Sequence, residues 1–255
     1  MITGDPNLSR ARGQKAQQRR SNMQQHIEQH NTIDFNSARR PRQRSIELCP
    51  RTQAQERLVL DLLDADAHIV VTLGPAGTGK SYLAMLAALR DLRAGRCERI
   101  VLTRPAVAVE DERHGFLPGD LVRKMEPWTR PLLDIMKEFY NPREVVRMIE
   151  DDIVEISPLA FMRGRTFKHA WIVADEMQNA TPNQVKMLLT RIGSGTRMVL
   201  TGDVEQTDRA RADNGLLDLA HRLENHAQDG IRLCCLGQRD IQRHPIIDSV
   251  LRLYG

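Results

Sequence analysis

The residues best suited to chemistry lie in one short stretch, Gly74 to Ser81, which reads Gly-Pro-Ala-Gly-Thr-Gly-Lys-Ser. It fits the pattern G-x-x-x-x-G-K-S, whose backbone N–H groups, lysine and hydroxyl can surround phosphate groups and Mg²⁺. An apolar run precedes the stretch and a helix-forming run follows it, so a helix N-terminus would also face the phosphates. A flexible glycine turn is the alternative interpretation. In this setting the pattern predicts a nucleotide site formed by Gly74, Pro75, Ala76, Gly77, Thr78, Gly79, Lys80, Ser81 and Tyr82.

Two adjacent carboxylates, Asp175 and Glu176, end another apolar run farther along the chain. In a phosphate-loop enzyme such an Asp helps to hold Mg²⁺, together with the hydroxyl of Ser81, and the Glu can orient the attacking water. Alone, an Asp-Glu pair is often only a cap between a strand and a helix. Together with the glycine-rich loop, the pair predicts Lys80, Asp175 and Glu176 as catalytic residues and Ser81 and Asp175 as metal ligands.

A polar group that senses the γ-phosphate is expected after the next strand, within the stretch Thr201 to Gln206. We predict Gln206 as this sensor, because in a RecA-like strand order its strand would insert between the phosphate-loop strand and the Asp175 strand. A simple turn capped by Asp203 is the alternative.

Positive charge for the transition state can come from Arg104, Arg239 or Arg243, and Arg243 is the preferred candidate. Whether such an arginine serves its own subunit or a neighbour stays open, and surface salt bridges are the alternative. Gln55 lies upstream of the loop, where its side-chain amide could read the adenine edge as donor and acceptor. A solvated helix glutamine is the alternative there.

Short apolar runs alternate with helix-forming runs, which predicts an α/β fold with a mainly parallel sheet flanked by helices. The ligand should then lie at the carboxyl ends of the strands. The insert between Thr103 and Ile153 contains several prolines, which predict a loop and short or kinked helices. Strands are expected at Ile69–Leu73, Arg99–Thr103, Ile153–Ser157, Ala170–Ala174, Arg197–Thr201 and Ile231–Leu236, and helices at Gln53–Asp64, Tyr82–Arg93, Asn183–Ile192, Leu216–Glu224 and Pro245–Leu253.

Charge divides the 255-residue chain into two parts. Residues 1–45 hold nine Lys or Arg against three Asp or Glu, a net of +6, so within the whole-chain charge of +4 the remainder carries about −2. This polar composition predicts a disordered basic extension over 1–45 and one folded domain over 46–255. The extension either holds phosphate backbones by charge or only increases solubility. The sequence has no C-x-x-C pair, membrane-length apolar run or signal-peptide core, so a cytoplasmic protein without membrane contact is expected.

The ordered motifs resemble those of the PhoH-like family of phosphate-starvation-inducible ATPases, which is related to the core of superfamily 1 helicases. The resemblance covers about Pro50 to Gly255. Besides the glycine-rich loop, the matching segments are Leu102–Pro105, Gly115–Leu121, Pro158–Thr166, Asp175–Thr181, Lys186–Gly193, Thr201–Asp203 and Arg243–Pro245. The chain lacks the acidic cluster of relatives fused to a nuclease-like domain, so RNA cleavage by this chain is not expected.

The resemblance implies a RecA-like fold, ATP and Mg²⁺ as cofactors, ATP hydrolysis, and work on RNA. By motif, Gln55 resembles the adenine contact and Gln206 the sensor glutamine. The stretch Thr103-Arg104-Pro105 resembles a helicase segment that grips a strand backbone. Two further family arginines, Arg163 and Arg165, are nucleic-acid-binding candidates whose role the motif does not assign.

These observations favour a Mg²⁺-dependent ATPase that binds, moves along or remodels single-stranded RNA or DNA. One core of this kind cannot form the two-domain cleft of a monomeric helicase, so a homo-oligomer is expected, with a hexameric ring as its form. An ATP-gated RNA-binding adaptor that recruits a nuclease partner is the alternative. Phosphate transfer to a small molecule is disfavoured, because Glu176 and Gln206 suit a water nucleophile.

Overall fold

The computed structural model describes residues 44–105, 121–206, 213–244, 246, 247, 250 and 253. The predicted basic extension over residues 1–45 lies outside these ranges except for Arg44 and Ser45, so its disorder stays a prediction. Of the expected helix at 245–253, the described positions 246, 247, 250 and 253 are helical.

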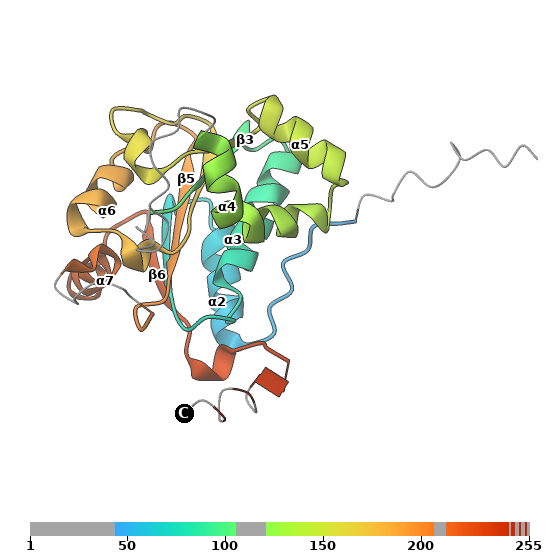
Figure 1. Ribbon diagram of the computed structural model, residues 1–255. Coiled ribbons are helices and arrows are strands. Elements are labelled where there is room, and N and C mark those ends of the chain that lie inside the picture. The colour runs from blue at the N-terminus through green and yellow to red at the C-terminus, as the bar shows by residue number, and fades with distance from the viewer. Residues whose placement is uncertain are drawn as a thin grey trace, which may run out of the picture. The chain divides into compact units, whose positions relative to one another are not determined.

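Six parallel strands form a single sheet in the described part of the chain, in the order β3-β2-β4-β5-β1-β6 (Figure 1). This order places β5 between β1 and β4, as the sequence predicted, and the predicted α/β fold is confirmed. Because parallel strands end at the same edge, the segments after β1, β4 and β5 come together there. The strands are β1 (Ile69–Leu73), β2 (Arg99–Thr103), β3 (Val154–Ile156), β4 (Ala170–Ala174), β5 (Arg197–Gly202) and β6 (Ile231–Cys235).

Helices cover both faces of the sheet, α2 to α5 on one face and α6 and α7 on the other (Figure 1). Alternate strand residues divide between two apolar cores; Val70 of β1 packs on the α3 side and Val71 on the α6 and α7 side. Both faces of the strands are therefore buried, which explains their nearly continuous apolar sequences. The helices are α2 (Gln53–Leu63), α3 (Lys80–Arg93), α4 (Leu121–Lys137), α5 (Pro142–Glu150), α6 (Pro182–Leu189) and α7 (Gly215–Asn225), with the short 3₁₀ turns η1 (Leu159–Met162), η2 (Met177–Asn179) and η4 (Gln238–Asp240).

The proline-rich insert differs in part from its prediction. Helix α4 continues for 17 residues through Pro127 and Pro131, so these prolines do not divide the segment into short helices. Pro142 instead begins the nine-residue helix α5, where its missing N–H has no intrahelical partner to lose. Asn141 and Glu144 complete a capping box at that helix end.

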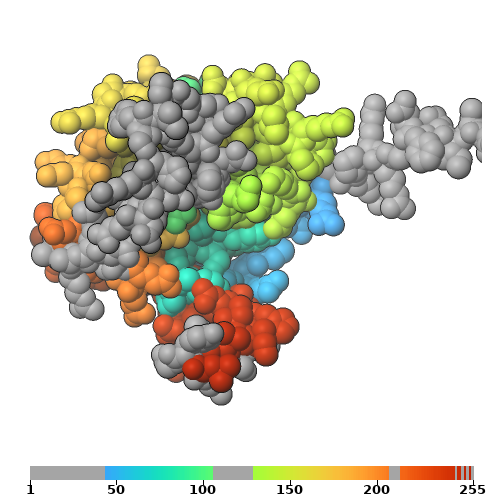
Figure 2. Space-filling model, viewed as in Figure 1, coloured from blue at the N-terminus to red at the C-terminus, as the bar shows by residue number. Residues whose placement is uncertain are grey.

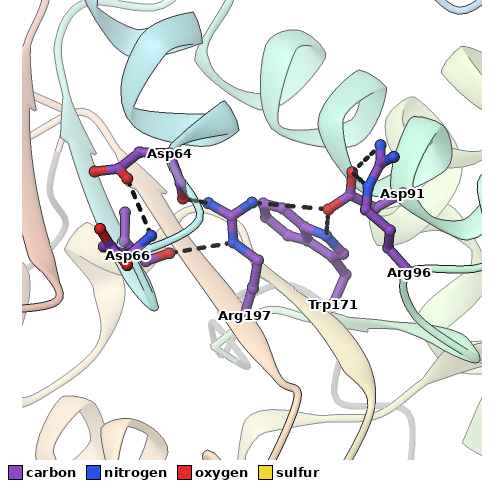
Figure 3. A network of polar contacts seen from close by, with 7 residues as sticks. Asp64, Asp66, Asp91, Arg96, Trp171 and Arg197 are labelled. Atoms are coloured by element: carbon purple, nitrogen blue, oxygen red, sulfur yellow. Dashed lines mark hydrogen bonds and ion pairs between the residues drawn. The ribbon is translucent and has the colours of Figure 1, made fainter.

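A polar network joins α3, β4 and β5 at the amino-terminal edge of the sheet, opposite the edge where the predicted site lies (Figure 3). Asp91 of α3 accepts hydrogen bonds from the Trp171 indole N–H at 2.7 Å and from Arg96 Nη2 at 2.7 Å. Arg197 of β5 lies over the Trp171 ring, 4.9 Å from its centroid, and donates to the carbonyls of Ala67 and Asp64. This network fixes α3, β4 and β5 relative to one another.

No helix among the described residues is both long and apolar enough to cross a bilayer. The four cysteines are free thiols, and Cys97 and Cys234 are buried. Burial raises the pKa of each of these two thiols to about 12, so both stay protonated at neutral pH.

Candidate active site

The glycine-rich loop joins the carboxyl end of β1 to the first residue of α3, as its pattern predicts. Gly77 and Gly79 have φ values of 85° and 82°, in the left-handed region that favours glycine. Gly79 precedes α3 without a side-chain cap, so the backbone N–H groups at this helix end can serve an anion. The loop therefore has the backbone form that a phosphate site requires.

Lys80 is folded back onto the loop in this structure. Its Nζ donates to the Gly74 and Pro75 carbonyls at 2.6 and 2.8 Å, and its residue surface is 7% exposed. Burial lowers the pKa of Lys80, and the negative charges of Asp203 and Asp175 oppose this shift. The ammonium group is thus desolvated and positioned beside carboxylates, where an incoming phosphate would be a strong partner.

Asp175 and Ser81 lie in contact at the end of β4 and the start of α3. Ser81 Oγ donates to Asp175 Oδ1 at 2.6 Å, and the Thr201 hydroxyl donates to the same oxygen. Hydroxyl and carboxylate oxygens are ligands that suit Mg²⁺, which usually completes its shell with water and phosphate oxygens. The pair fits a metal site of that kind, and among the residues that the structure describes no cluster of three or more His, Cys, Asp and Glu competes with it.

Glu176 is held in an uncommon backbone conformation at the turn into η2. Its φ of 56° and ψ of 37° are left-handed, which is strained for a residue with a side chain. One carboxylate oxygen accepts from Gln178 Nε2 at 2.5 Å, and the other lies 3.5 Å from Arg104 Nη2. The strained turn and these two partners fix the orientation of the Glu176 carboxylate.

A cavity of about 250 Å³ brings these residues together. A larger hollow of about 1080 Å³ opens at the other edge of the sheet, beside Trp171 and Arg197, and none of the predicted site residues lines it. The lining chemistry, more than the volume, therefore identifies the smaller cavity as the candidate active site. Its lining residues are Ala76, Gly77, Gly79, Lys80, Ser81, Tyr82, Asp175, Glu176, Thr201, Gly202, Asp203 and Gln206.

A family model described as "PhoH-like protein" matches residues 47–255, which is most of the chain. The chain belongs to the PhoH-like family. Its relatives include PhoH-like proteins of Synechocystis sp. (42% identical over 186 residues) and Bacillus subtilis (42% over 204 residues), and Protein PhoH of Escherichia coli (35% over 191 residues). These matches cover 73%, 80% and 74% of this chain but 56%, 63% and 53% of the relatives, so the chain spans little more than half of their length.

Solved structures similar to this PhoH-like protein include the Hef helicase domain of Pyrococcus furiosus and the Pif1 helicase of Candida albicans. The first has 12% identity and a TM-score of 0.41, covering 73% of this chain and 38% of that one. The second has 16% identity and a TM-score of 0.37, covering 79% of this chain and 43% of that one. Family membership, with the complete glycine-rich loop, places the chain in the P-loop NTPase class, which implies a nucleotide site.

Gln55 of the PhoH-like protein braces the phosphate loop. Its side chain is buried, with Nε2 donating to the Thr78 carbonyl at 3.0 Å and Oε1 accepting from the Arg51 N–H at 2.7 Å. Both ends of the amide are therefore engaged within the protein. Its contact with adenine stays a prediction, and it requires at least one of these bonds to change.

Arg243 lies over the phosphate loop of its own chain. A Cβ atom at Gly77 would come within 2.4 Å of Arg243 Nε, and the Gln242 N–H donates to the Gly77 carbonyl at 2.8 Å. In Figure 2 the red C-terminal segment borders the teal surface that follows the loop. Among the three arginines considered from sequence, the structure therefore places Arg243 against the loop, whereas Arg104 pairs with Glu176 and Arg239 lies in the exposed turn η4.

The nucleic-acid-binding candidates fall into two groups. Thr103 and Pro105 are buried at the end of β2, and Arg165 is paired with Glu155, Nη2 to Oε2 at 2.9 Å, and stacked on Phe167. Arg163 is exposed. No contact in the structure tests nucleic-acid binding by any of them, so their roles stay predictions.

Three residues near the site were not predicted to act there, namely Gln178, Thr201 and, except as a local cap, Asp203. Gln178 Oε1 accepts from the Asp203 N–H at 3.1 Å, and its Nε2 holds Glu176. Asp203 also accepts from the Ala76 N–H in the loop at 3.0 Å. Their position at the carboxyl ends of β4 and β5 was the available signal, but it does not show which polar group contacts which.

Proposed function

We propose that this PhoH-like protein hydrolyses ATP with Mg²⁺ and uses the reaction to bind and move along, or remodel, single-stranded nucleic acid, with RNA as the expected substrate. The observation that carries the proposal is that Lys80, Asp175 and Glu176 line one cavity. A lysine, a carboxylate beside a hydroxyl and a second oriented carboxylate suit the transfer of a γ-phosphate to water. Glu176 and Gln206 together suit a water nucleophile, which disfavours transfer to a metabolite.

Mg²⁺ would be held by Ser81 and Asp175, whose oxygens are already 2.6 Å apart. When bound, the ion neutralises charge on the phosphate oxygens. Lys80 would exchange its loop carbonyls for phosphate oxygens, and Arg243 would add positive charge beside Gly77. The exchange replaces the neutral carbonyl partners of the Lys80 ammonium group by charged phosphate oxygens, which strengthens its hydrogen bonds.

Glu176 would orient the attacking water and accept a hydrogen bond from it. Gln178 at 2.5 Å and Arg104 at 3.5 Å hold the carboxylate from two sides, which limits its rotation. A fixed acceptor close to the reacting water contributes through positioning and through general-base character.

A line of contacts supports coupling of this site to nucleic acid. Arg104 pairs with Glu176, and the Arg104 carbonyl accepts from the Leu159 N–H at 3.5 Å, at the start of η1. The same turn presents Phe161, which is 59% exposed, and is followed by the exposed Arg163. An exposed aromatic ring can stack on a base while a neighbouring arginine contacts a phosphate. A nucleic-acid strand bound at this turn would be connected to Glu176 through the η1 contact with Arg104 and the pairing of Arg104 with Glu176.

Binding of labelled single-stranded RNA, followed by fluorescence anisotropy at several salt concentrations, tests this surface. Phe161→Ala is expected to weaken binding by about 1–3 kcal/mol, because one stacked base loses its platform. Arg163→Gln is expected to lower the slope of log affinity against log salt by about 0.7, the share of one phosphate contact on a single strand. Val146→Ala, at an exposed apolar residue of α5, is the control and should bind as the wild type does. Wild-type affinity in both test variants would remove η1 from the proposal.

The described residues contain one parallel sheet and hence one RecA-like ATPase core. A nucleic-acid strand held between two ATPase cores needs a second copy of the chain, or a further domain, to supply the second core. We therefore propose a cytoplasmic homo-oligomer, with a hexameric ring as the expected form, that encloses the nucleic acid.

A further inference from the structure

Asp203 places a buried carboxylate directly on the phosphate loop. The residue is 6% exposed, and its Oδ2 accepts from the Ala76 N–H at 3.0 Å. Its Oδ1 accepts from the Glu205 N–H at 3.0 Å, so the side chain is fixed at both oxygens. A loop whose N–H groups serve phosphates is thus partly occupied by an anion of the protein itself.

The same carboxylate lies in the cavity that holds the Lys80 ammonium group. Among the described residues, the short contacts of Lys80 Nζ are to neutral oxygens, the Gly74 and Pro75 carbonyls and the Thr78 hydroxyl. Asp203 therefore adds a fixed negative charge to the cavity in which a phosphate would meet Lys80.

We propose that Asp203 competes with the terminal phosphate of ATP and so sets the preference of the site between ATP and ADP. The inference rests on the proposed ATP-binding function and adds a specificity-determining residue to it. Asp203 and Lys80 line the same cavity, and like charges repel strongly in a partly buried site. Mg-ATP carries more negative charge than Mg-ADP, so a carboxylate in the cavity repels ATP more than ADP.

Displacement of Asp203 would also change the orientation of the Glu176 carboxylate through Gln178. The Asp203 N–H donates to Gln178 Oε1 at 3.1 Å, and Gln178 Nε2 donates to Glu176 Oε2 at 2.5 Å. A shift of Asp203 away from an incoming phosphate changes the bond that orients Gln178, and Gln178 in turn orients Glu176. ATP, unlike ADP, would then adjust the carboxylate that positions water.

The test measures dissociation constants for Mg-ATP and Mg-ADP by isothermal titration calorimetry on the full chain at low salt. Asp203→Asn keeps the shape and one acceptor oxygen, for either Ala76 or Glu205, but removes the charge. It is expected to raise the affinity for ATP relative to ADP by about tenfold, and added salt should shrink the effect. Glu205→Gln removes a carboxylate from an exposed position two residues away and should leave the ratio unchanged. Asp203→Glu retains the charge and should keep a ratio near that of the wild type.

Equal effects of Asp203→Asn on both nucleotides, or a fall in the ATP to ADP affinity ratio, would show that Asp203 only braces the loop and would overturn the inference. If the wild type binds both nucleotides in that experiment, the proposed function survives this failure. A wild type that binds neither nucleotide would overturn the proposed function and the inference with it.

Discussion

Glu176→Gln is expected to lower the rate of ATP hydrolysis by about 10²–10⁴-fold while leaving nucleotide affinity nearly unchanged, since a general base contributes about that factor. The amide keeps the size of the side chain and a carbonyl oxygen, but it cannot polarise water as a carboxylate does. Its position is set by the left-handed turn at Glu176 and by Gln178 and Arg104. The turn should survive the substitution, and the one amide oxygen can still accept from Gln178, whereas the ion pair with Arg104 is lost.

Released phosphate under saturating Mg-ATP measures the rate, and calorimetric titration measures the affinity. Glu205→Gln serves as the matched control, because it makes the same chemical change at an exposed position and should hydrolyse ATP at the wild-type rate. A Glu176→Gln variant that retains the wild-type rate would mean that another group positions the water.

Asp91→Ala is expected to lower the free energy of unfolding by about 3–5 kcal/mol, the usual effect of breaking a buried charge network. Asp91 is 5% exposed and accepts from both the Trp171 indole and the Arg96 guanidinium (Figure 3). It also lies 3.7 Å from the Arg197 guanidinium, whose side chain is 18% exposed. Alanine would leave the indole N–H unpaired and Arg197 with less countercharge, and both losses are costly inside a protein.

Urea unfolding followed by circular dichroism tests this expectation. Asp91→Asn can still accept from Trp171 and should lose less stability than Asp91→Ala. Asp134→Ala makes the same change in an exposed pair with Lys137 and should have little effect. An Asp91→Ala variant as stable as the wild type would show that Arg197 and Trp171 hold α3, β4 and β5 together without the carboxylate.

The parts of the site that follow from local sequence were predictable. The loop from Gly74 to Ser81 carries its own backbone chemistry, and the apolar run before Asp175 shows that the two carboxylates end a strand. The order of β5 between β1 and β4 was also predicted, but from the RecA-like strand order that the motifs resemble and not from the local pattern. Local pattern thus located the candidate catalytic groups.

The hydrogen bonds between these groups were not predictable, because they join segments far apart in the chain. Gln55 was predicted to contact adenine, yet its amide holds the Thr78 carbonyl and the Arg51 N–H. The alternative interpretation of Asp203 as a turn cap is correct in part, because the carboxylate accepts from the Glu205 N–H. Its hydrogen bond from the Ala76 N–H depends on the pairing of β1 with β5 and could not be read from local sequence. The continuity of α4 through two prolines is likewise a tertiary outcome, since intrinsic propensity disfavours it.

The rate of ATP hydrolysis with and without single-stranded RNA tests the proposed function. We expect release of inorganic phosphate with Mg-ATP and faster release when RNA is added. Lys80→Ala should show neither, because Lys80 is the cation that the loop pattern directs to the phosphates. A wild-type rate that RNA leaves unchanged would contradict the proposed coupling and would favour an ATP-gated adaptor that recruits a nuclease. Transfer of the γ-phosphate to a small molecule in place of water would contradict the assignment of Glu176 itself.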